Sequence, residues 1–537
     1  MRTVLLSILT LLLLGFNAPQ TKPYDFIIKG ARIVDGSGNP WYEADIAIKD
    51  GRIAAIGRFD SELASDFKDV HELIVAPGFI DVHTHVESSI RRLPTADNFL
   101  FDGVTSIVTG NCGGSATALD SFFVALRDSG ISLNVSTLIG HNSVRRAVMG
   151  LAQRDPTPDE QSQMEALVEK AMQEGAVGFS TGLIYIPGTY SKTPEVVGLA
   201  RAAARHYGVY ASHIRNEGND EQMDVFGAIA EAINIGREAH IPVEISHFKV
   251  SSKKLWGASK KTISLVEQAR GEGLDVTVDQ YPYTASSTNL GVLAPSWALA
   301  DGDSAMKLRF ADAKTRKKIV ADMKKSLDRA GRTNYGYAVV ARCRWDSTLE
   351  GKTISQINKL RKRKATLDNE IKTVLEMLEQ GGAGMVYHTM NEDDVQRILQ
   401  YPYSMVASDA GVVEFGTGMP HPRAYGTNAR VLARYVREKK IVRLEEAIRK
   451  MTSLPAQRFR FTDRGLIRPG MWADIVVFDP ATVGDKATFE KPHAYSTGIH
   501  YVLVNGKIVI NHERHTGARP GQIILGPGAT RQVSIMK

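Results

Sequence analysis

One stretch of this chain indicates the fold more clearly than any other: Gly78-Phe79-Ile80-Asp81-Val82-His83-Thr84-His85. It is a short apolar run that ends in two histidines, which is typical of a buried strand followed by a functional loop. Similar runs recur at 106–109, 135–139, 178–180, 209–212, 243–246, 275–279 and 404–408. Amphipathic helical patterns separate most of them, among them Thr157–Gln173, Pro194–Tyr207, Gln222–Ala239 and Lys261–Glu272. Repeated β-then-α units predict an α/β fold, and eight strands predict a (β/α)₈ barrel of the TIM type.

Strand patterns of a different kind lie at the two ends of the chain. Tyr24–Ile33 alternates, and a hairpin around Asp50-Gly51 follows it, while Ala473–Phe478 and Tyr501–Ile510 are strands near the other end. We therefore expect a small β-sandwich domain made from both termini, residues 21–77 and 464–537, around a barrel at 78–463. A polar, basic region at about 289–381 interrupts the barrel pattern before the last strand. Its first part, 289–345, is predicted to be a lid-like insertion. The alternative is a surface insertion that has no functional role.

The first 20 residues have the pattern of a secretory signal. Met1-Arg2 precedes the apolar run Val4–Leu14, and Gly15, Asn17 and Pro19 follow it. The run is too short to span a bilayer comfortably. This pattern predicts export to the periplasm or the extracellular space, without stable membrane insertion once the signal is removed.

Composition narrows the class of protein. The chain has 537 residues, of which 43% are apolar and 23% charged, which is ordinary for a globular protein. Its net charge of +7 is small for this length, and its basic clusters are typical of solvated helix faces. We therefore expect no nucleic-acid partner. A basic surface could still attract an anionic small-molecule substrate.

Polar side chains follow the predicted strands at the point where each strand ends. They are His83, His85, Cys112, His213, His247 and Asp409. In a barrel the carboxyl ends of all strands open onto one face, so these groups are expected to converge. Taken singly, Cys112 could be a small buried apolar residue and Asp409 a helix N-cap. Together, imidazoles, a thiolate and a carboxylate form a set of ligands suited to zinc.

The order of several motifs resembles that of a known family. These motifs are Asp81-Val82-His83-Thr84-His85, Gly110-Asn111-Cys112-Gly113, Ser212-His213-Ile214-Arg215, Ser246-His247-Phe248-Lys249, Asp279-Gln280-Tyr281-Pro282-Tyr283, Ser408-Asp409 and His421-Pro422-Arg423-Ala424-Tyr425-Gly426-Thr427. In this order they resemble the N-acyl-D-amino-acid deacylases (D-aminoacylases) of the amidohydrolase superfamily. The likeness runs from about Tyr24 to Phe478.

The resemblance implies roles for individual residues. It implies one tightly bound zinc ion held by Cys112, His213 and His247, and a weaker second position lined by His83, His85 and Asp409. It also implies that four residues hold the substrate carboxylate: Lys249, Tyr281, Ser287 and Arg423. Tyr185 is implied to lie beside the scissile carbonyl. Asp409 is expected to take a proton from the attacking water and deliver it to the leaving amine.

The expected activity is hydrolysis of the amide bond of N-acyl-D-amino acids, which gives a carboxylate and a free D-amino acid. Cleavage of D-residue-containing dipeptides or of a cyclic amide by the same metal site is the nearest alternative. A ring hydrolase would more typically carry a metal-bridging lysine, and Cys112 stands in that place. A non-catalytic zinc-binding protein is disfavoured because Asp409 and every expected ligand are present.

Overall fold

The computed structural model describes residues 22–530, and within them parallel strands close into a barrel. In barrel order the strands are β6 (Phe79–Asp81), β7 (Val104–Thr109), β8 (Asn134–Thr137) with β9 (Ile139–Gly140), β10 (Gly178–Gly182), β11 (Val209–His213), β12 (Val243–Ile245), β13 (Val276–Gln280) and β17 (Ser404–Val406). Only Leu138 separates β8 from β9, so the two are halves of one barrel strand. A parallel bridge between Thr84 and Ala410 joins the last strand to the first. This architecture agrees with the predicted TIM-type barrel.

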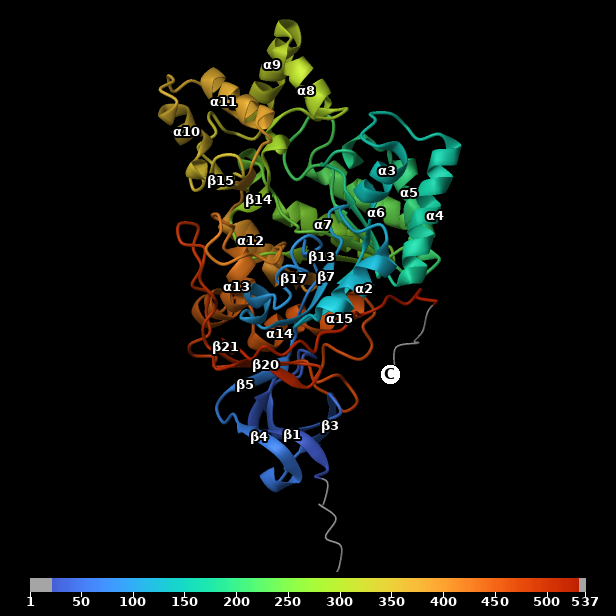
Figure 1. Cartoon of the computed structure of the whole chain (residues 1–537), viewed down its shortest axis with the longest axis vertical. Coiled ribbons are helices and arrows are strands. Elements are labelled where there is room, and N and C mark those ends of the chain that lie inside the picture. The colour runs from blue at the N-terminus through green and yellow to red at the C-terminus, as the bar shows by residue number, and fades with distance from the viewer. Residues whose placement is uncertain (1–21, 531–537) are drawn as a thin grey trace, which may run out of the picture.

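Helices surround the barrel on its outside (Figure 1). They include α4 (Pro158–Glu174), α5 (Thr193–Ala204), α6 (Val225–Ala239) and α7 (Ser259–Gly271). At the start of α4, Thr157 and Glu160 form a reciprocal capping box, which satisfies amide groups that the first helical turn leaves free. Met164, Val168 and Met172 recur on one face of α4 and are fully buried. That spacing places an apolar stripe against the strands.

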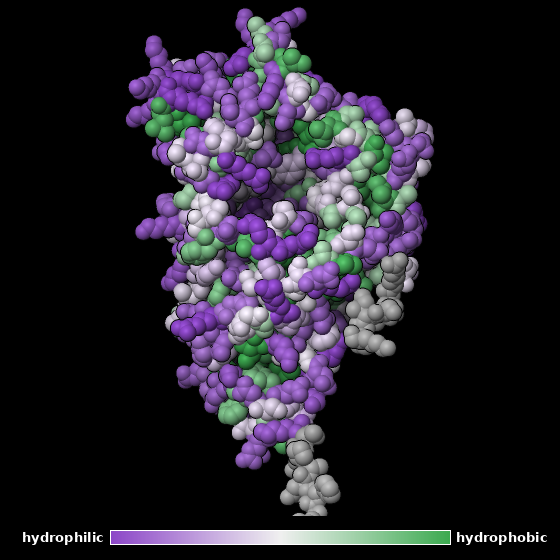
Figure 2. Space-filling model, viewed as in Figure 1, coloured by the Kyte–Doolittle hydropathy of each residue, from purple (hydrophilic) through white to green (hydrophobic). Residues whose placement is uncertain are grey.

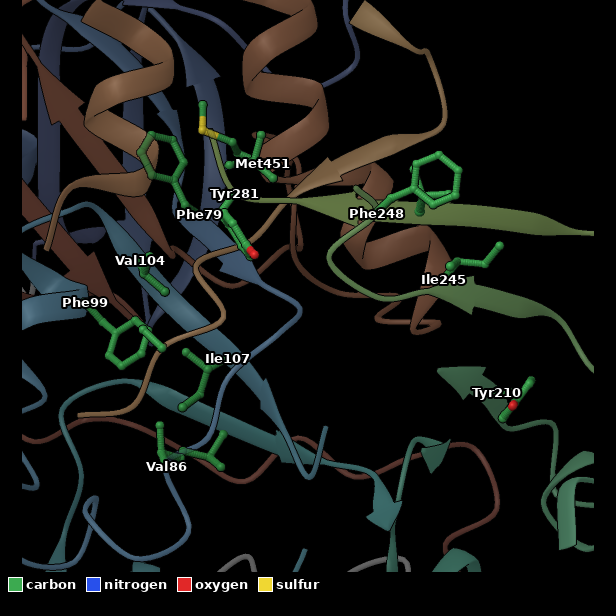
Figure 3. Packing of buried hydrophobic residues seen from close by; sticks show 14 of the residues in the cluster. Phe79, Val86, Phe99, Val104, Ile107, Tyr210, Ile245, Phe248, Tyr281 and Met451 are labelled. Carbon is green, nitrogen blue, oxygen red and sulfur yellow. The ribbon is translucent and has the colours of Figure 1, made fainter. Parts of the chain in front are cut away.

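The apolar core lies between the strands and these helices. Figure 3 shows Phe79 of β6 beside Met451 of α14 (Leu444–Met451), and Phe99 near Ile107 of β7. All four side chains are at most 2% exposed. Such packing holds the strand ends, and therefore the residues that follow them, in place.

Strands from both ends of the chain share one sheet below the barrel (Figure 1). It runs in the order β21 (Arg514–His515), β20 (Lys507–Asn511), β19 (Ile499–Val504), β18 (Ile475–Phe478), β5 (Ile74–Pro77), β1 (Tyr24–Ile33), β2 (Tyr42–Lys49) and β3 (Arg52–Gly57), with β4 (Ala64–Asp69) paired to β1. The antiparallel pairing of β5 with β18 joins the two ends. The hydrogen bonds thus link strands from both ends of the chain into one small β-domain.

The last described residues return to the barrel. Val135 of β8 donates its N–H to the carbonyl of Gln522 and accepts from the N–H of Ile524, at 2.9 and 2.8 Å. The segment 521–526 therefore pairs with the barrel and lies apart from the terminal sheet, although the whole of 464–537 was assigned to the small domain. Backbone groups at the outer edge of β8 need partners, and this segment supplies them.

The interruption before the last barrel strand is a separate subdomain, residues 286–387, which stands over one end of the barrel (Figure 1). It contains β14 (Ser286–Asn289), β15 (Ala338–Arg342), β16 (Gly384–Tyr387), α8 (Asp303–Ala311), α9 (Ala313–Arg329), α10 (Ile354–Leu360) and α11 (Leu367–Glu379). Phe310, Met323, Ile371 and Leu375 belong to its own buried core. The subdomain extends past the predicted 289–345 because β16 lies between β14 and β15 and completes their sheet.

None of the helices within residues 22–530 is long and apolar enough to cross a membrane. The expected signal, residues 1–20, lies outside the described residues.

Candidate metal centre and substrate pocket

Three of the predicted ligands meet at a single point at the carboxyl end of the barrel. Cys112 follows β7, His213 ends β11 and His247 follows β12. The Nδ1 atom of His213 lies 2.6 Å from the Nε2 atom of His247, and the sulfur of Cys112 lies 3.5 Å from both nitrogens. Three electron-pair donors aimed at one another in this way form a site for a cation.

The other three predicted ligands adjoin this group. His85 Nε2 lies 3.1 Å from Asp409 Oδ1, and His83 Nε2 lies 3.7 Å from the same oxygen. His83 Nε2 is also 3.3 Å from the sulfur of Cys112, so the cysteine lies between the two groups. The donor set of thiolate, imidazole and carboxylate fits zinc.

The backbone is strained at three of these residues. Cys112, His247 and Asp409 have φ values of 52°, 37° and 52°, in the left-handed region. Non-glycine residues in sparsely populated conformations cost about 1–3 kcal/mol each and gather at functional sites. Hydrogen bonds hold two of them, because the N–H of Asp409 donates to the carbonyl of His83 at 2.9 Å and that of His247 to Asp279 Oδ1 at 2.8 Å. At each residue this backbone turn aims the side chain at the shared site.

The charges at the site favour the metal-binding form of Cys112. Burial opposes its ionisation, but the nearby imidazoles, with His83 first, outweigh burial and hold the pKa of the thiol well below its ordinary value. The pKa of His213 is lowered by burial and then by the charge of His247. A thiolate and a neutral imidazole are the forms that bind zinc.

Two carboxylates orient the histidines from behind. Asp279 Oδ2 lies 3.1 Å from Nδ1 of His83, and Glu217 Oε1 lies 3.0 Å from Nδ1 of His247. Each contact leaves the Nε2 atom of that histidine facing the site, which is the usual arrangement behind metal-binding histidines. Glu217 was not singled out in the sequence. The sequence feature that points to Glu217 is its position four residues after His213, in the loop that follows a barrel strand.

Arg423 places a cation beside the carboxylate of Asp409. It begins α13 (Arg423–Arg430), is 4% exposed, and its Nη1 lies 2.9 Å from Asp409 Oδ2. Its guanidinium carbon lies 4.4 Å from the centre of the Tyr281 ring. Burial raises the pKa of Asp409, but Arg423 and His83 outweigh it and hold that pKa well below its ordinary value. No helix begins at Asp409, so the N-cap alternative is wrong.

The remaining predicted substrate residues divide into two groups. A cavity of about 400 Å³ is lined by Tyr185, Ser287 and Arg423, together with His85, Cys112 and Asp409. Lys249 and Tyr281 are buried behind it: Lys249 Nζ donates to Glu217 and to the carbonyl of His247. The Ser287 hydroxyl donates to the carbonyl of Met385 at 2.8 Å, which leaves its lone pairs for a ligand.

Tyr185 presents a protonated hydroxyl to the cavity. Burial, and after it the negative charge of Cys112, raises the pKa of Tyr185 well above its ordinary value. Thr288 donates to the Tyr185 hydroxyl at 3.0 Å, so the hydroxyl hydrogen of Tyr185 is free to donate to a ligand. The Tyr185 ring lies 4.7 Å from that of His213, which places the donor beside the candidate metal position. His141 lies at the start of α3 (His141–Met149), where its Nε2 is 2.8 Å from Glu195 Oε1, and it does not line the cavity.

Comparison with known proteins places this chain in a family. Residues 67–510 match the model of the amidohydrolase family. The chain is 35% identical to the D-aminoacylase of Alcaligenes xylosoxydans xylosoxydans over 95% of its own length and 99% of the relative's. It belongs to the D-aminoacylase family of amidohydrolases. The N-acyl-D-glutamate and N-acyl-D-aspartate deacylases of the same organism are 35% and 34% identical, over 93% and 94% of the chain and 96% and 95% of their own lengths.

Solved structures of the D-aminoacylase family agree with this assignment. The N-acyl-D-glutamate deacylase of Bordetella bronchiseptica, in complex with zinc and a phosphonate inhibitor, matches with a TM-score of 0.80 and 35% identity, over 94% of this chain and 99% of that one. A D-aminoacylase described as having a binuclear metal centre matches with a TM-score of 0.79 and 35% identity, over 94% of this chain and 100% of that one. This protein is a metal-dependent amidohydrolase of the D-aminoacylase type.

Proposed function

We propose that this chain uses zinc to hydrolyse the amide bond of N-acyl-D-amino acids, releasing a carboxylate and a free D-amino acid. The position of Asp409 carries the proposal. One of its oxygens lies 3.1 Å from His85 and the other 2.9 Å from Arg423. A group that can transfer protons therefore stands between the candidate metal centre and the cation best suited to hold a substrate carboxylate.

Arg423 supplies the carboxylate-binding group. Its planar guanidinium can donate two parallel hydrogen bonds to a carboxylate. Stacking on Tyr281 holds the plane of the guanidinium, and the carbonyl of Ser287 accepts from Nη2 at 3.3 Å. A substrate carboxylate anchored here would lie in the same cavity as Asp409, with its amide directed towards Cys112 and Tyr185.

Asp409 and Tyr185 supply the proton transfer and the stabilisation of charge. As water adds to the amide carbon, the Asp409 carboxylate takes a proton from the water and delivers it to the nitrogen as the C–N bond breaks. Tyr185 donates its hydroxyl hydrogen to the carbonyl oxygen as negative charge develops there.

Zinc fits the residues of the centre. Cys112, His213 and His247 would hold one ion, and His83, His85 and Asp409 a second. When bound, zinc polarises a carbonyl oxygen and lowers the pKa of a water ligand. The zinc in the N-acyl-D-glutamate deacylase structure supports this choice of metal.

The test is amine release from matched N-acetyl-D- and N-acetyl-L-amino acids with acidic, basic and apolar side chains. Each is measured with zinc-loaded protein and with protein treated with a chelator. We expect zinc-dependent turnover of the D-series alone. No turnover of either series by a preparation shown to contain zinc would contradict the proposal, and the same preparation would then be assayed with D-residue dipeptides and cyclic amides.

A further inference from the structure

A second and larger cavity opens beside the metal centre, between the subdomain and the barrel. Its volume is about 570 Å³, and it shares Ser287, Asp409 and Arg423 with the cavity over the proposed metal ligands. In the view of Figure 2, hydrophilic residues surround a hollow on the face of the molecule beneath the subdomain. A ligand anchored at Arg423 can therefore extend from one cavity into the other.

Arginines are the main charged residues of this second cavity. We define the arginine pocket by Arg92 from the barrel and Arg342 and Arg344 from the subdomain, all of which line it. Arg92 Nη1 is paired with Glu414 at 2.8 Å, and Arg342 Nη1 with Glu350 at 3.0 Å. The structure gives Arg344 no hydrogen bond or ion pair with any residue in 22–530.

The carboxylates of the cavity do not balance these cations. Asp409 and Glu414 are the acidic residues that line it. Asp409 is paired with Arg423 and Glu414 with Arg92. Arg344, an exposed residue, therefore lines a cavity whose lining has no further carboxylate to pair with it.

The whole subdomain adds to this positive field. Residues 286–387 contain 19 lysines and arginines against 11 aspartates and glutamates, a net charge of +8, while the complete chain carries +7. The excess of positive charge is thus concentrated in the part of the molecule that stands over the site. Such a field raises the local concentration of anions and speeds their association.

We propose that the arginine pocket binds a second anionic group of the substrate, the side-chain carboxylate of an acidic N-acyl-D-amino acid. The α-carboxylate is held at Arg423, and the side chain reaches across to Arg344. The proposal rests on the proposed function. A neutral side chain in the same place forms no ion pair with Arg344, whereas a carboxylate can accept charge-assisted hydrogen bonds from its guanidinium.

The test compares N-acetyl-D-glutamate with N-acetyl-D-glutamine, which has nearly the same shape but a neutral side chain. We expect kcat/KM of the wild-type protein to favour glutamate by at least about tenfold. Arg344→Gln should lower that ratio about tenfold or more, chiefly through KM for glutamate, and Arg344→Glu should lower it further. Arg344 is chosen because its loss leaves no carboxylate of the protein without its partner.

Lys325→Gln is the matched control, because Lys325 is an exposed cation on α9 that does not line the cavity. We expect it to leave the ratio unchanged, and zinc content and circular dichroism to show that each variant is folded. The proposal for the arginine pocket would be overturned by equal kcat/KM of the wild type for N-acetyl-D-glutamate and N-acetyl-D-glutamine. It would also be overturned if Lys325→Gln lowered the ratio as much as Arg344→Gln. Turnover of neutral D-substrates in that case would leave the proposed function standing, whereas no turnover of any D-substrate would overturn both.

Discussion

The carboxylate of Asp409 is shared between Arg423 and His85, with Nη1 of Arg423 at 2.9 Å from one oxygen and Nε2 of His85 at 3.1 Å from the other. The three residues come from different parts of the chain and meet only where β6 and β17 adjoin. This contact joins the candidate metal centre to the candidate carboxylate site. The first prediction follows from it.

Replacing Asp409 by Asn should remove proton transfer while keeping the shape of the side chain. We expect kcat to fall by about 10²–10⁴, the usual contribution of a positioned acid or base. One zinc ion per chain should remain, because Cys112, His213 and His247 are unchanged. Steady-state kinetics and elemental analysis check both points. Asp393→Asn, at an exposed position on α12 (Glu392–Gln400), is the control, and an active Asp409→Asn protein would refute the assigned role.

Glu217 should act on the metal through His247. Its carboxylate lies 3.0 Å from Nδ1 of that ring, and replacing such a partner typically lowers metal affinity about 10–100-fold. We expect Glu217→Ala to raise the zinc Kd by that factor, as measured by competition with a chelator of known affinity. Glu221→Ala, 77% exposed in the same loop, is the matched control. Equal zinc affinities in all three proteins would show that Glu217 does not position His247.

We expect the subdomain to unfold without disrupting the metal centre. Phe310 is fully buried in the core of the subdomain, and Phe→Ala in a core costs about 3–5 kcal/mol. We expect Phe310→Ala to expose residues 290–387 to limited proteolysis and to lower turnover, while zinc content stays at the wild-type level. Loss of zinc, or cleavage within the barrel first, would mean that the two parts unfold together.

Lys450 should make stability depend on pH. Its ammonium group is buried in α14, where Nζ donates to the carbonyls of Tyr401 and Ser404, and burial lowers the pKa of Lys450 to about 7. Between pH 7 and the ordinary value of 10.5, the unfolded chain binds a proton that the folded chain lacks, so stability rises with pH. Each pH unit in that interval contributes about 1.4 kcal/mol.

Lys450→Met removes this titration. Relative to the variant, the wild type should gain about 2–3 kcal/mol in the free energy of unfolding between pH 7 and pH 9, from about 1.4 kcal/mol per unit. Urea unfolding of both proteins across this range measures the difference, in which the titration of all other groups cancels. Parallel pH profiles would contradict the assignment.

Several features of the fold and the site could be predicted from local pattern. Short apolar runs that alternate with amphipathic helices identify barrel strands without any knowledge of long-range contacts, because each run reports its own burial. Asp409 directly follows such a run, and Cys112 comes three residues after another, so both are recognisable from the local pattern. Other features were not predictable in this way. The extent of the subdomain depends on β16 inserting between β14 and β15, and no local signal shows which strand pairs with which.

The sequence by itself determined the periodic β/α pattern, the polar residues at the strand ends and hence the metal-dependent chemistry, because these depend on the nature of each residue and its near neighbours. Only the tertiary structure decided which side chains act together. Glu217 reaches His247 from the loop after a neighbouring strand, and Arg423 reaches Asp409 from the start of α13. Such contacts join residues far apart in the chain, and their distances are set by packing, to which every part of the molecule contributes.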